Sequence, residues 1–308
     1  MPTWLITGGS GFLGRHVRHA LARRGGVNVV SLGRRLPAGC DPRAFVAADL
    51  EQPETVARAL RRVNPSVVIH AAGRTPPGTP DEFERANTRA TLHLIDALRT
   101  NRPYARLVVV GSAAELGPVP PHRLPVGEDE PCRPADAYGE SKYLATLAAL
   151  ATRGPLEVMV ARVFNPVGPG LPSHQAFGRF VARLLDPCPG PLFVGDLDAR
   201  RDFVDVRDVA TALIALAECG RAGRLYHVGT GRSHGVGEGL LRLYRRSGRN
   251  LDVRVDPNLA NAPGPRDSTA DVRRINGETG WHAAIDFETS LDDLWDEAAA
   301  RSRLPLTA

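Results

Sequence analysis

Residues 7–14 read Thr7-Gly8-Gly9-Ser10-Gly11-Phe12-Leu13-Gly14, between a short apolar segment and a helical pattern. In this spacing Gly8 permits a tight turn, Gly11 lets the backbone approach a pyrophosphate, and Gly14 lets a helix pack closely on a strand. The N-terminus of that helix presents free amides and the positive end of its dipole to the phosphates. A strand before the glycines and a helix after them are the context that such a motif requires. The stretch therefore predicts a dinucleotide-binding loop, with contacts from Gly8, Ser10, Gly11, Phe12, Leu13 and Gly14.

Around this loop, short apolar runs alternate with amphipathic helical patterns through the first half of the chain. The expected strands are Trp4–Thr7, Val27–Leu32, Ala44–Ala48, Val67–His70, Leu107–Gly111 and Glu157–Arg162. The expected helices lie near Leu13–Arg24, Pro53–Val63, Asp81–Thr100 and Ala137–Thr152. Such alternation is typical of βαβ units and predicts an α/β fold with a Rossmann-type, doubly wound parallel sheet.

After about residue 165 the alternation weakens, and Pro and Gly cluster in the segments NPVGPGLP (165–172) and DPCPGP (186–191). Further helices are expected near Val206–Glu218, Gly237–Ser247 and Leu291–Arg303. We therefore expect two parts. The first is a dinucleotide-binding domain over residues 1–165, completed by roughly 203–230. The second is a smaller substrate-binding lobe over roughly 166–202 and 231–308.

Composition limits the class of function. Basic residues exceed acidic ones by only 39 − 34 = 5 and are spread along the chain, which gives little support to nucleic-acid binding. No apolar run is long enough to cross a bilayer, and the N-terminal residues lack the pattern of a signal peptide. We expect a cytoplasmic protein with no membrane partner, no bound metal and reduced thiols, since no paired metal motif is formed by Cys40, Cys132, Cys188 and Cys219.

The end of the second expected strand predicts which dinucleotide binds. An acid there would bind the ribose 2′-hydroxyl of NAD and repel a 2′-phosphate. This chain instead has two guanidiniums, Arg34 and Arg35, which suit bidentate binding of a phosphate. We therefore expect NADP(H) as the cofactor. The alternative is that both arginines are solvated surface residues.

Residues at the ends of the next two strands are placed to contact the rest of the cofactor. Asp49 and Leu50 follow the third expected strand, where the adenine would lie, although Asp49 also suits a helix N-cap. Ala71, Ala72 and Gly73 form a small-residue loop after the fourth strand. This loop allows close passage of the nicotinamide ribose.

The chemistry is predicted by three residues. Tyr138 and Lys142 are four positions apart on an expected helix, so their side chains share one face. Lys142 is the only lysine in the chain, which indicates a task that arginine does not perform. An ammonium beside a phenol favours phenolate, so we expect the pKa of Tyr138 to lie below its usual value of about 10. Ser112 ends the fifth expected strand, where its hydroxyl can hold a substrate carbonyl beside the phenol.

Motifs along nearly the whole chain resemble the extended short-chain dehydrogenase/reductase family, which includes the NAD-dependent epimerases and dehydratases of nucleotide sugars. They are TGGSGFLG, ADL, HAAG, NTRATLHLIDAL, GSAAELG, YGESK, ARVFNPVGPG, RRDFVDVRDVA and TGW. Within that family, AELG, YGESK, FNPVGPG and VGDLDARRDFVDVRDVA are similar to the subgroup of GDP-6-deoxy-4-keto-D-mannose reductases. The chain departs from the subgroup at Leu116, where a tyrosine is usual, and at Asp196, where an asparagine is usual. The segment 261–271 also looks shorter than usual.

The resemblance implies roles for further residues. Ser112, Tyr138 and Lys142 would be the catalytic trio, and Asn87 would order the helix that bears Tyr138. The nicotinamide and the sugar would be bordered by Phe164, Asn165 and Val167, with Val110 on the cofactor side and Ala113 on the substrate side.

The resemblance also implies how the substrate and a second copy of the chain bind. Arg201 would bind the diphosphate of a nucleotide-linked substrate, with Arg266 as a second clamp. The alternative for Arg201 is an ion pair with one of the neighbouring acids Asp196, Asp198 and Asp202. Family members usually form homodimers through two helices, which here correspond to Asp81–Thr100 and Ala137–Thr152. Packing of these helices on their own sheet explains most of the same apolar residues.

Missing residues narrow the reaction within the family. Its dehydratases have an acid pair directly after the catalytic hydroxyl, where this chain has Ala113 and Ala114. Its epimerase-reductases that form GDP-fucose use a cysteine and a histidine, where this chain has Ala114 and Gly170, with His174 displaced and more suited to a structural role.

Ketone reduction and 4-epimerisation remain, and the preference for NADP(H) favours the reductase, because a 4-epimerase keeps a bound NAD. We therefore expect an NADPH-dependent reductase of the 4-keto group of a nucleotide-linked 4-keto-6-deoxy sugar. A 4-epimerase, a ketoreductase of a non-sugar metabolite and a non-catalytic NADP-binding regulatory protein stay open.

Overall fold

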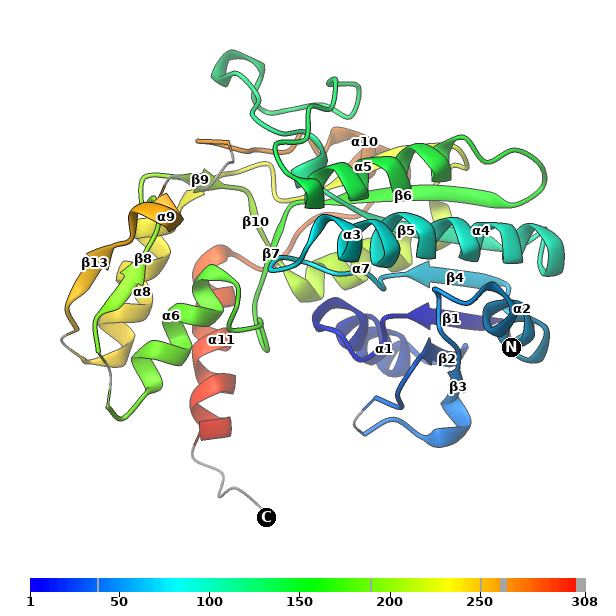
Figure 1. Ribbon diagram of the computed structural model, residues 1–308, viewed down its shortest axis with the longest axis horizontal. Coiled ribbons are helices and arrows are strands. Elements are labelled where there is room, and N and C mark those ends of the chain that lie inside the picture. The colour runs from blue at the N-terminus through cyan, green and yellow to red at the C-terminus, as the bar shows by residue number, and fades with distance from the viewer. Residues whose placement is uncertain (38, 189, 250, 261–264, 303–308) are drawn as a thin grey trace.

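The computed structural model describes residues 1–37, 39–188, 190–249, 251–260 and 265–302. Its centre is a seven-stranded sheet in the order β11-β6-β5-β4-β1-β2-β3 (Figure 1). All six neighbouring pairs are parallel. The strands are β1 (Thr3–Thr7), β2 (Asn28–Gly33), β3 (Phe45–Ala47), β4 (Val67–His70), β5 (Arg106–Ser112), β6 (Glu157–Val163) and β11 (Leu225–Val228). The predicted doubly wound parallel sheet is confirmed, and no predicted strand end differs from the observed end by more than one residue.

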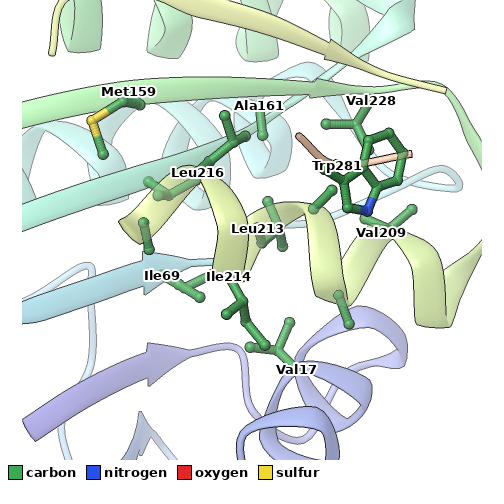
Figure 2. Close-up of a cluster of buried hydrophobic side chains, with 14 of the residues drawn as sticks. Val17, Ile69, Met159, Ala161, Val209, Leu213, Ile214, Leu216, Val228 and Trp281 are labelled. Carbon is green, nitrogen blue, oxygen red and sulfur yellow. The ribbon is translucent and has the colours of Figure 1, made fainter. Parts of the chain in front are cut away.

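Alternate residues of each strand point to opposite faces of the sheet, and each face is buried under helices. On one face, α1 (Phe12–Arg24) and α7 (Val206–Cys219) cover residues such as Ile6 and Ile69. Figure 2 shows side chains of α1 and α7 packed against this face. The other face, which includes Leu5, is covered by α2 (Pro53–Val63), α4 (Ala90–Asn101) and α5 (Ala137–Leu150). Because both faces of the sheet are buried, the sequences of these strands are near-continuous apolar runs.

The prediction of one helix over Asp81–Thr100 is wrong in its detail. The segment is divided into α3 (Pro80–Phe83), a π-helical stretch (Glu84–Arg89) and α4. The wider turn of the π-helix carries Asn87, whose side chain bonds to Ser141 of α5. Apolar periodicity does not reveal such a turn, because the residues on either side still follow a helical pattern.

Part of the chain after β6 forms a second hydrophobic cluster beside the sheet, whereas α7 and β11 belong to the core of the sheet itself. The second cluster contains residues of α6 (Ala176–Leu185), α8 (Val236–Ser247) and α11 (Phe287–Ser302), which gather at one side of Figure 1. Strand β13 (Val253–Val255) pairs with β8 (Leu192–Val194) there. The chain later returns to the large sheet, where Ile275 and Trp281 join the core. The predicted division into two domains stays a prediction, and position 303 of the last expected helix lies outside the described residues.

Short elements connect these layers. The helices are α9 (Pro257–Ala260) and α10 (Arg273–Thr279), and the single turns of 3-10 helix are Pro42–Ala44, Ala113–Glu115 and Pro121–Arg123. The remaining strands are β7 (Asn165–Val167), β9 (Arg200–Arg201), β10 (Phe203–Asp205) and β12 (His234–Gly235). β7 pairs with β10 and β9 with β12, so the chain after β6 is held to the segments that follow α6 and α7.

Four structural observations bear on the expected compartment, metal content and partners of the protein. All four cysteines are free. Across the described ranges, no helix is long and apolar enough to cross a membrane, and no group of three His, Cys, Asp or Glu side chains is arranged to hold a metal ion. Leu92 of α4 and Leu144 and Leu147 of α5 are exposed. They lie on the two helices of the predicted dimer interface, which stays a prediction.

Candidate active site

The glycine loop between β1 and α1 is shaped by close backbone contacts. Gly8 has a φ of 69°, and a β-carbon on it would lie 2.7 Å from the carbonyl oxygen of Ala71. A β-carbon on Gly14 would lie 2.1 Å from the carbonyl oxygen of Gly8. Gly11 is the N-cap of α1, and among the described residues no side chain caps this helix and no acid lies in its first turn. The first amides of α1 are therefore free for an anion, so the loop fits the pyrophosphate of a dinucleotide.

A cavity of about 720 Å³ joins this loop to the ends of three further strands. The carboxyl ends of parallel strands meet at one edge of a sheet, and the loops after β1, β4, β5 and β6 form its walls. Sixteen of the predicted site residues line it: Gly11, Phe12, Leu13, Gly14, Ala71, Ala72, Gly73, Asn87, Val110, Ser112, Ala113, Tyr138, Lys142, Phe164, Asn165 and Arg201.

Ser112, Tyr138 and Lys142 lie together in this cavity. The Ser112 hydroxyl, at the end of β5, lies close enough to the phenol of Tyr138 on α5 to influence the pKa of that phenol. One turn further along α5, Lys142 is buried and its Nζ donates to the carbonyl oxygen of Val110 at 2.6 Å. The geometry therefore places a hydroxyl, a phenol and an ammonium on one wall.

Two local features hold α5 against the end of β5. The Asp136 carboxylate caps the helix by accepting from the amide of Gly139 at 2.7 Å. Gly139 itself is required by space, because a β-carbon on it would lie 2.5 Å from the carbonyl oxygen of Ala114. The Tyr-Gly pair of the YGESK motif thus brings the first turn of α5, and Tyr138 with it, next to Ser112.

The expected lowering of the Tyr138 pKa is wrong for this structure. Burial raises the pKa of Tyr138, because desolvation disfavours the phenolate, and the Ser112 hydroxyl only partly opposes it. Burial also lowers the pKa of Lys142, which the carboxylate of Glu115 opposes. Lys142, whose ammonium donates to Val110, is not among the groups that lower the pKa of the phenol. At neutral pH the phenol therefore carries its proton and can donate it.

Asn87 connects the loop after β4 to the helix of Tyr138, as its expected ordering role requires. Its Nδ2 donates to Ser141 Oγ at 2.9 Å and to the carbonyl oxygen of Arg74 at 3.1 Å. Its Oδ1 accepts from the amide of Arg74 at 2.8 Å. The side chain is buried, so these bonds tie α5 to the cavity wall after β4.

Glu115 is a residue of the site for which the sequence analysis predicted no role. Its side chain is fully buried below Ser112, and Oε1 accepts from the Ser112 amide at 2.7 Å. Oε2 accepts from Nε of Arg162 at 3.0 Å. The spacing Ser112-x-x-Glu115 is the pattern of a capping box, and this pattern could have indicated the contact of Glu115 with Ser112.

The substrate side of the cavity contains Arg201 and a buried hydroxyl. Arg201 Nη1 donates to the carbonyl oxygen of Arg200 at 2.8 Å, and within the described ranges its guanidinium forms no ion pair. The alternative partner Asp202 is buried, and its carboxylate accepts from backbone amides of residues 230, 231 and 270 instead. Ser268 lines the same wall, and its buried Oγ has no hydrogen-bond partner in the described part of the chain. Nothing in the sequence pattern distinguished Ser268.

Two of the predicted cofactor residues line a separate depression at the edge of the sheet. Arg34 and Asp49 both line a hollow of about 490 Å³ between β3 and α2, and Arg58 and Arg62 line it as well. Asp49 is not the helix N-cap, since Gln52 has that position and Asp49 accepts from the amide of Glu51 instead.

The other predicted residues lie outside both hollows. Arg35 and Ser10 are exposed, and the carbonyl oxygen of Leu50 is bonded to the ring of His93. Val167 packs into the second hydrophobic cluster, because its strand faces α6 and α11. Arg266 is exposed, and only its backbone carbonyl contacts Arg201. The structure therefore does not bring Val167 and Arg266 into the cavity.

Gly170 has a φ of 75°, which favours glycine, and the guanidinium of Arg15 on α1 packs against it. Arg15 Nη2 donates to the carbonyl oxygen of Pro169 at 2.8 Å, and a β-carbon on Gly170 would lie 1.2 Å from that nitrogen. No side chain at position 170 can reach the cavity while Arg15 keeps this place. His174, for which a structural role was expected, lines the cavity, and its Nε2 lies 3.3 Å from Thr75 Oγ1.

Comparisons with known proteins agree with this geometry. The family model described as "NAD dependent epimerase/dehydratase family" matches residues 4–229. A dTDP-6-deoxy-L-talose 4-dehydrogenase (NAD(P)(+)) of Kitasatospora kifunensis is 30% identical over 98% of this chain and 96% of its own. The GDP-6-deoxy-D-mannose reductase of Pseudomonas aeruginosa is 29% identical, over 97% of each chain. The structure of RMD from Pseudomonas aeruginosa complexed with NADPH has a TM-score of 0.83 at 26% identity, covering 98% of this chain and 100% of that one. The chain therefore belongs to the NAD-dependent epimerase/dehydratase family of nicotinamide-dependent enzymes, as its resemblance to the extended short-chain dehydrogenases predicts.

Proposed function

We propose that the protein is an NADPH-dependent reductase of the 4-keto group of a nucleotide-linked 4-keto-6-deoxy sugar, of the GDP-6-deoxy-4-keto-mannose type. The observation that carries this proposal is the placement of Ser112, Tyr138 and Lys142 on one wall of a cavity whose other wall contains Arg201. Two relatives support it, because both are named for oxidation or reduction of a nucleotide-linked 6-deoxy sugar.

Each side chain has a separate task in this reaction. NADPH, when bound along the glycine loop, supplies the hydride. The Ser112 hydroxyl orients the ketone oxygen beside the phenol, and Tyr138 protonates that oxygen as the carbonyl is reduced. Lys142, which now donates to Val110, would hold the nicotinamide ribose when the cofactor is bound, and its positive charge would stabilise the phenolate formed at Tyr138.

Two observations argue against dehydration and 3,5-epimerisation, which need catalytic groups beyond the trio. Ala113 and Ala114 follow the catalytic hydroxyl, so no acid is present there to move protons during loss of water. Residue 170 is glycine, so this position provides no side chain to act as the acid of a 3,5-epimerase. Ketone reduction and 4-epimerisation need only a proton donor and a hydride, and the expected use of NADP(H) favours the reduction.

The first experiment follows NADPH consumption with freshly generated GDP-4-keto-6-deoxymannose, beside the dTDP and UDP 4-keto-6-deoxy sugars, and repeats each assay with NADH. Rapid oxidation of NADPH with the GDP sugar would support the proposal in full, and oxidation with the dTDP sugar alone would change only the nucleotide. Interconversion of 4-hydroxyl epimers without net NADPH loss would indicate a 4-epimerase instead. Tight NADPH binding without turnover of any of the three would contradict the proposed substrate and favour an unrelated ketone or a binding protein.

The preference for NADPH is expected to depend on Arg34 and Arg35. Arg34 borders the hollow of Asp49, and neither arginine forms an ion pair in the described part of the chain. Replacing both with Ala removes the partners of the 2′-phosphate, so the Kd for NADPH is expected to rise by about 10–100-fold while that for NADH stays unchanged. Fluorescence titration with each cofactor measures this.

The matched control for the cofactor variant is Arg99→Ala, which removes an exposed arginine at the far end of α4. It is expected to leave both affinities unchanged, which excludes a general effect of net charge. Equal weakening of NADPH and NADH in the Arg34 and Arg35 variant would contradict the proposed role of these residues.

Ser268→Ala is expected to weaken substrate binding without destabilising the free protein. The Oγ is buried without a partner, so its removal costs the free protein no hydrogen bond. A bond from Ser268 to a phosphate or hydroxyl of the substrate would be lost, which raises KM by about tenfold with kcat nearly unchanged. Steady-state kinetics and thermal unfolding, measured on the same variant, test both parts.

Ser290→Ala is the opposite control. Ser290 is also a buried serine, but its Oγ donates to Asp205 Oδ2 at 2.7 Å. Its removal is expected to lower the free energy of unfolding by about 1–2 kcal/mol and to leave KM unchanged. A Ser268→Ala variant that behaves like Ser290→Ala would show that Ser268 has only a structural role.

A further inference from the structure

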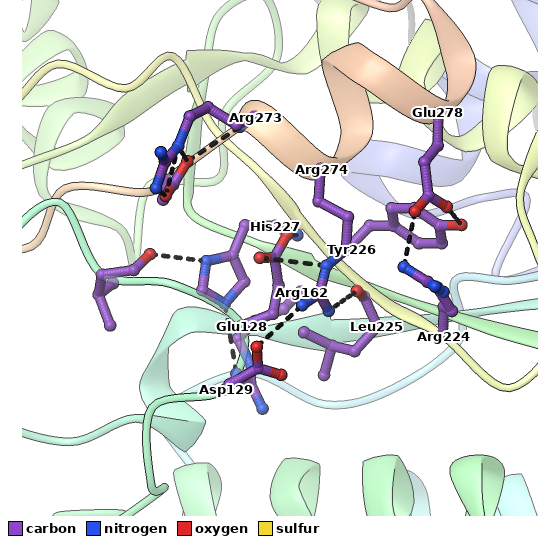
Figure 3. Close-up of polar contacts among 12 residues, drawn as sticks. Glu128, Asp129, Arg162, Arg224, Leu225, Tyr226, His227, Arg273, Arg274 and Glu278 are labelled. Atoms are coloured by element: carbon purple, nitrogen blue, oxygen red, sulfur yellow. Dashed lines mark hydrogen bonds and ion pairs between the residues drawn. The ribbon is translucent and has the colours of Figure 1, made fainter.

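A buried ion pair lies directly behind the catalytic residues. The side chains of Glu115 and Arg162 are 0% and 2% exposed, and Arg162 Nη2 lies 2.9 Å from Glu115 Oε2. Arg162 Nη1 also reaches His227 Nε2 at 3.3 Å, and Figure 3 shows Arg162 and His227 in one polar network with residues of α10. A buried ion pair is weak evidence for stability, since desolvation offsets its attraction. Stability therefore does not explain why an ion pair is buried at this place.

The Glu115 carboxylate joins the two elements that carry the catalytic groups. Oε1 accepts from the Ser112 amide at the end of β5 and from Thr146 Oγ1 of α5, at 2.7 and 3.1 Å. Thr146 lies one turn after Lys142 on that helix. A β-carbon on Gly111 would lie 2.6 Å from Oε1, so the carboxylate has its place only because residue 111 is glycine. Every partner of Glu115 can donate a hydrogen bond, which suits an ionised carboxylate.

We propose that Glu115 and Arg162 are positioning residues that act as one unit. They hold the Ser112 backbone against α5, and they keep the charge beside Tyr138 and Lys142 balanced. Neither needs to contact the substrate. The inference rests on the proposed use of Tyr138 as the proton donor, and it adds a reason why that phenol keeps its proton.

The other titratable groups that face Tyr138 and Lys142 leave this balance to the pair. His70 of β4 and His227 of β11 are buried, and burial lowers the pKa of each to about 3, so both are neutral. Burial raises the pKa of the Cys132 thiol, which is neutral as well. Asp136, the N-cap of α5, is the remaining acid near the phenol. Removing the Glu115 charge would therefore leave the guanidinium of Arg162 uncompensated, because arginine keeps its charge in proteins.

The test is Glu115→Gln, read by the titration of Tyr138 itself. In the NADP⁺-bound protein, the near-ultraviolet absorbance of phenolate is followed against pH, and the curve of the same variant with Tyr138→Phe is subtracted. The uncompensated guanidinium is expected to move the Tyr138 titration to lower pH by about one unit. The double variant Glu115→Gln/Arg162→Met, which removes both charges, is expected to return it close to wild type. This titration needs no substrate, so it stands apart from the assay of the proposed reaction.

The control is Glu157→Gln, which breaks the ion pair between Glu157 at the start of β6 and Arg106 at the start of β5. Ser112 and Arg162 lie near the opposite ends of these two strands. It is expected to leave the Tyr138 titration unchanged. A folded Glu115→Gln variant that titrates as wild type would overturn the proposal, and so would a double variant that stays shifted. If Glu115→Gln does not fold, Arg162→Gln keeps the carboxylate beside Lys142 and is expected to move the titration to higher pH. An unchanged titration in that variant would also overturn it.

Discussion

Tyr138→Phe is expected to lower kcat by about a thousandfold, with the affinity for NADPH unchanged. The substitution removes only the phenolic oxygen, and the ring keeps its edge contact with Phe83, at 5.7 Å between centroids. The ketone would still lie beside Ser112, but no proton donor would remain at its oxygen. Single-turnover oxidation of NADPH, measured beside a binding titration, separates the chemical step from cofactor affinity.

The pH dependence of the wild-type enzyme provides a second test of Tyr138 as the proton donor. A proton donor is active below its pKa, and burial raises the pKa of this phenol above its ordinary value of about 10. The rate of reduction is therefore expected to be flat through neutral pH and to fall only in strongly alkaline solution. In Tyr138→Phe this alkaline fall is expected to disappear from the residual activity. Near-normal turnover in that variant would refute the proposed acid.

Tyr143→Phe is the matched control. Tyr143 lies on the same helix, directly after Lys142, and does not line the cavity. Loss of its hydroxyl is expected to leave both kcat and the pH profile unchanged. A large loss of activity there would indicate that either substitution acts by disturbing α5.

Gly14→Ala is expected to destabilise the protein by about 3 kcal/mol or more and to abolish tight NADPH binding. The new methyl group would lie 2.1 Å from the carbonyl oxygen of Gly8. Both atoms belong to backbone or to a β-carbon, so no side chain can rotate to relieve the contact, and the loop must separate from α1. For a chain of this size the midpoint of thermal unfolding is expected to fall by about 10 °C. Calorimetry, with and without NADPH, measures both effects.

Gly277→Ala makes the same substitution inside α10, where a β-carbon would have no neighbour within 4 Å. Alanine is the better helix former by about 1 kcal/mol, so this variant is expected to gain stability. Helix propensity favours alanine at both positions, since both glycines lie in α-helices, and only at Gly14 does a steric clash outweigh that gain. A Gly14→Ala variant that folds normally and binds NADPH would show that the loop can take another form.

Local sequence patterns were sufficient to predict the large sheet. They were also sufficient to predict pairs of residues that lie close together within one helix or one loop. Six of the seven strands of the large sheet were predicted from apolar runs, and the seventh, β11, was not, although the segment around it was expected to return to the first domain. Tyr138 and Lys142 share a helix face because they are four residues apart. Gly8 and Gly14 contact each other within eight residues, so the spacing of the motif already contains their packing.

Contacts between distant residues were not contained in such patterns. Arg162 reaches Glu115 across 47 positions, and Asp202 reaches the amide of Ala270 across 68. The pKa of Tyr138 was predicted in the wrong direction, because the sequence places Lys142 nearby but contains no measure of burial. Val167 and Arg266 were expected at the site from resemblance, and the packing of β7 and of the segment after residue 264 directs them elsewhere.

The sequence by itself determined the parallel sheet and the dinucleotide loop and indicated the proposed catalytic trio, because turn, strand and helix preferences depend on neighbours a few residues away. Only the tertiary structure decided which of the predicted residues share one cavity. It also decided that Glu115 and Arg162 stand behind Ser112, and that Ser268 has a buried hydroxyl with no partner among the described residues. These properties depend on desolvation and on contacts between separate elements, which exist only once the chain has folded.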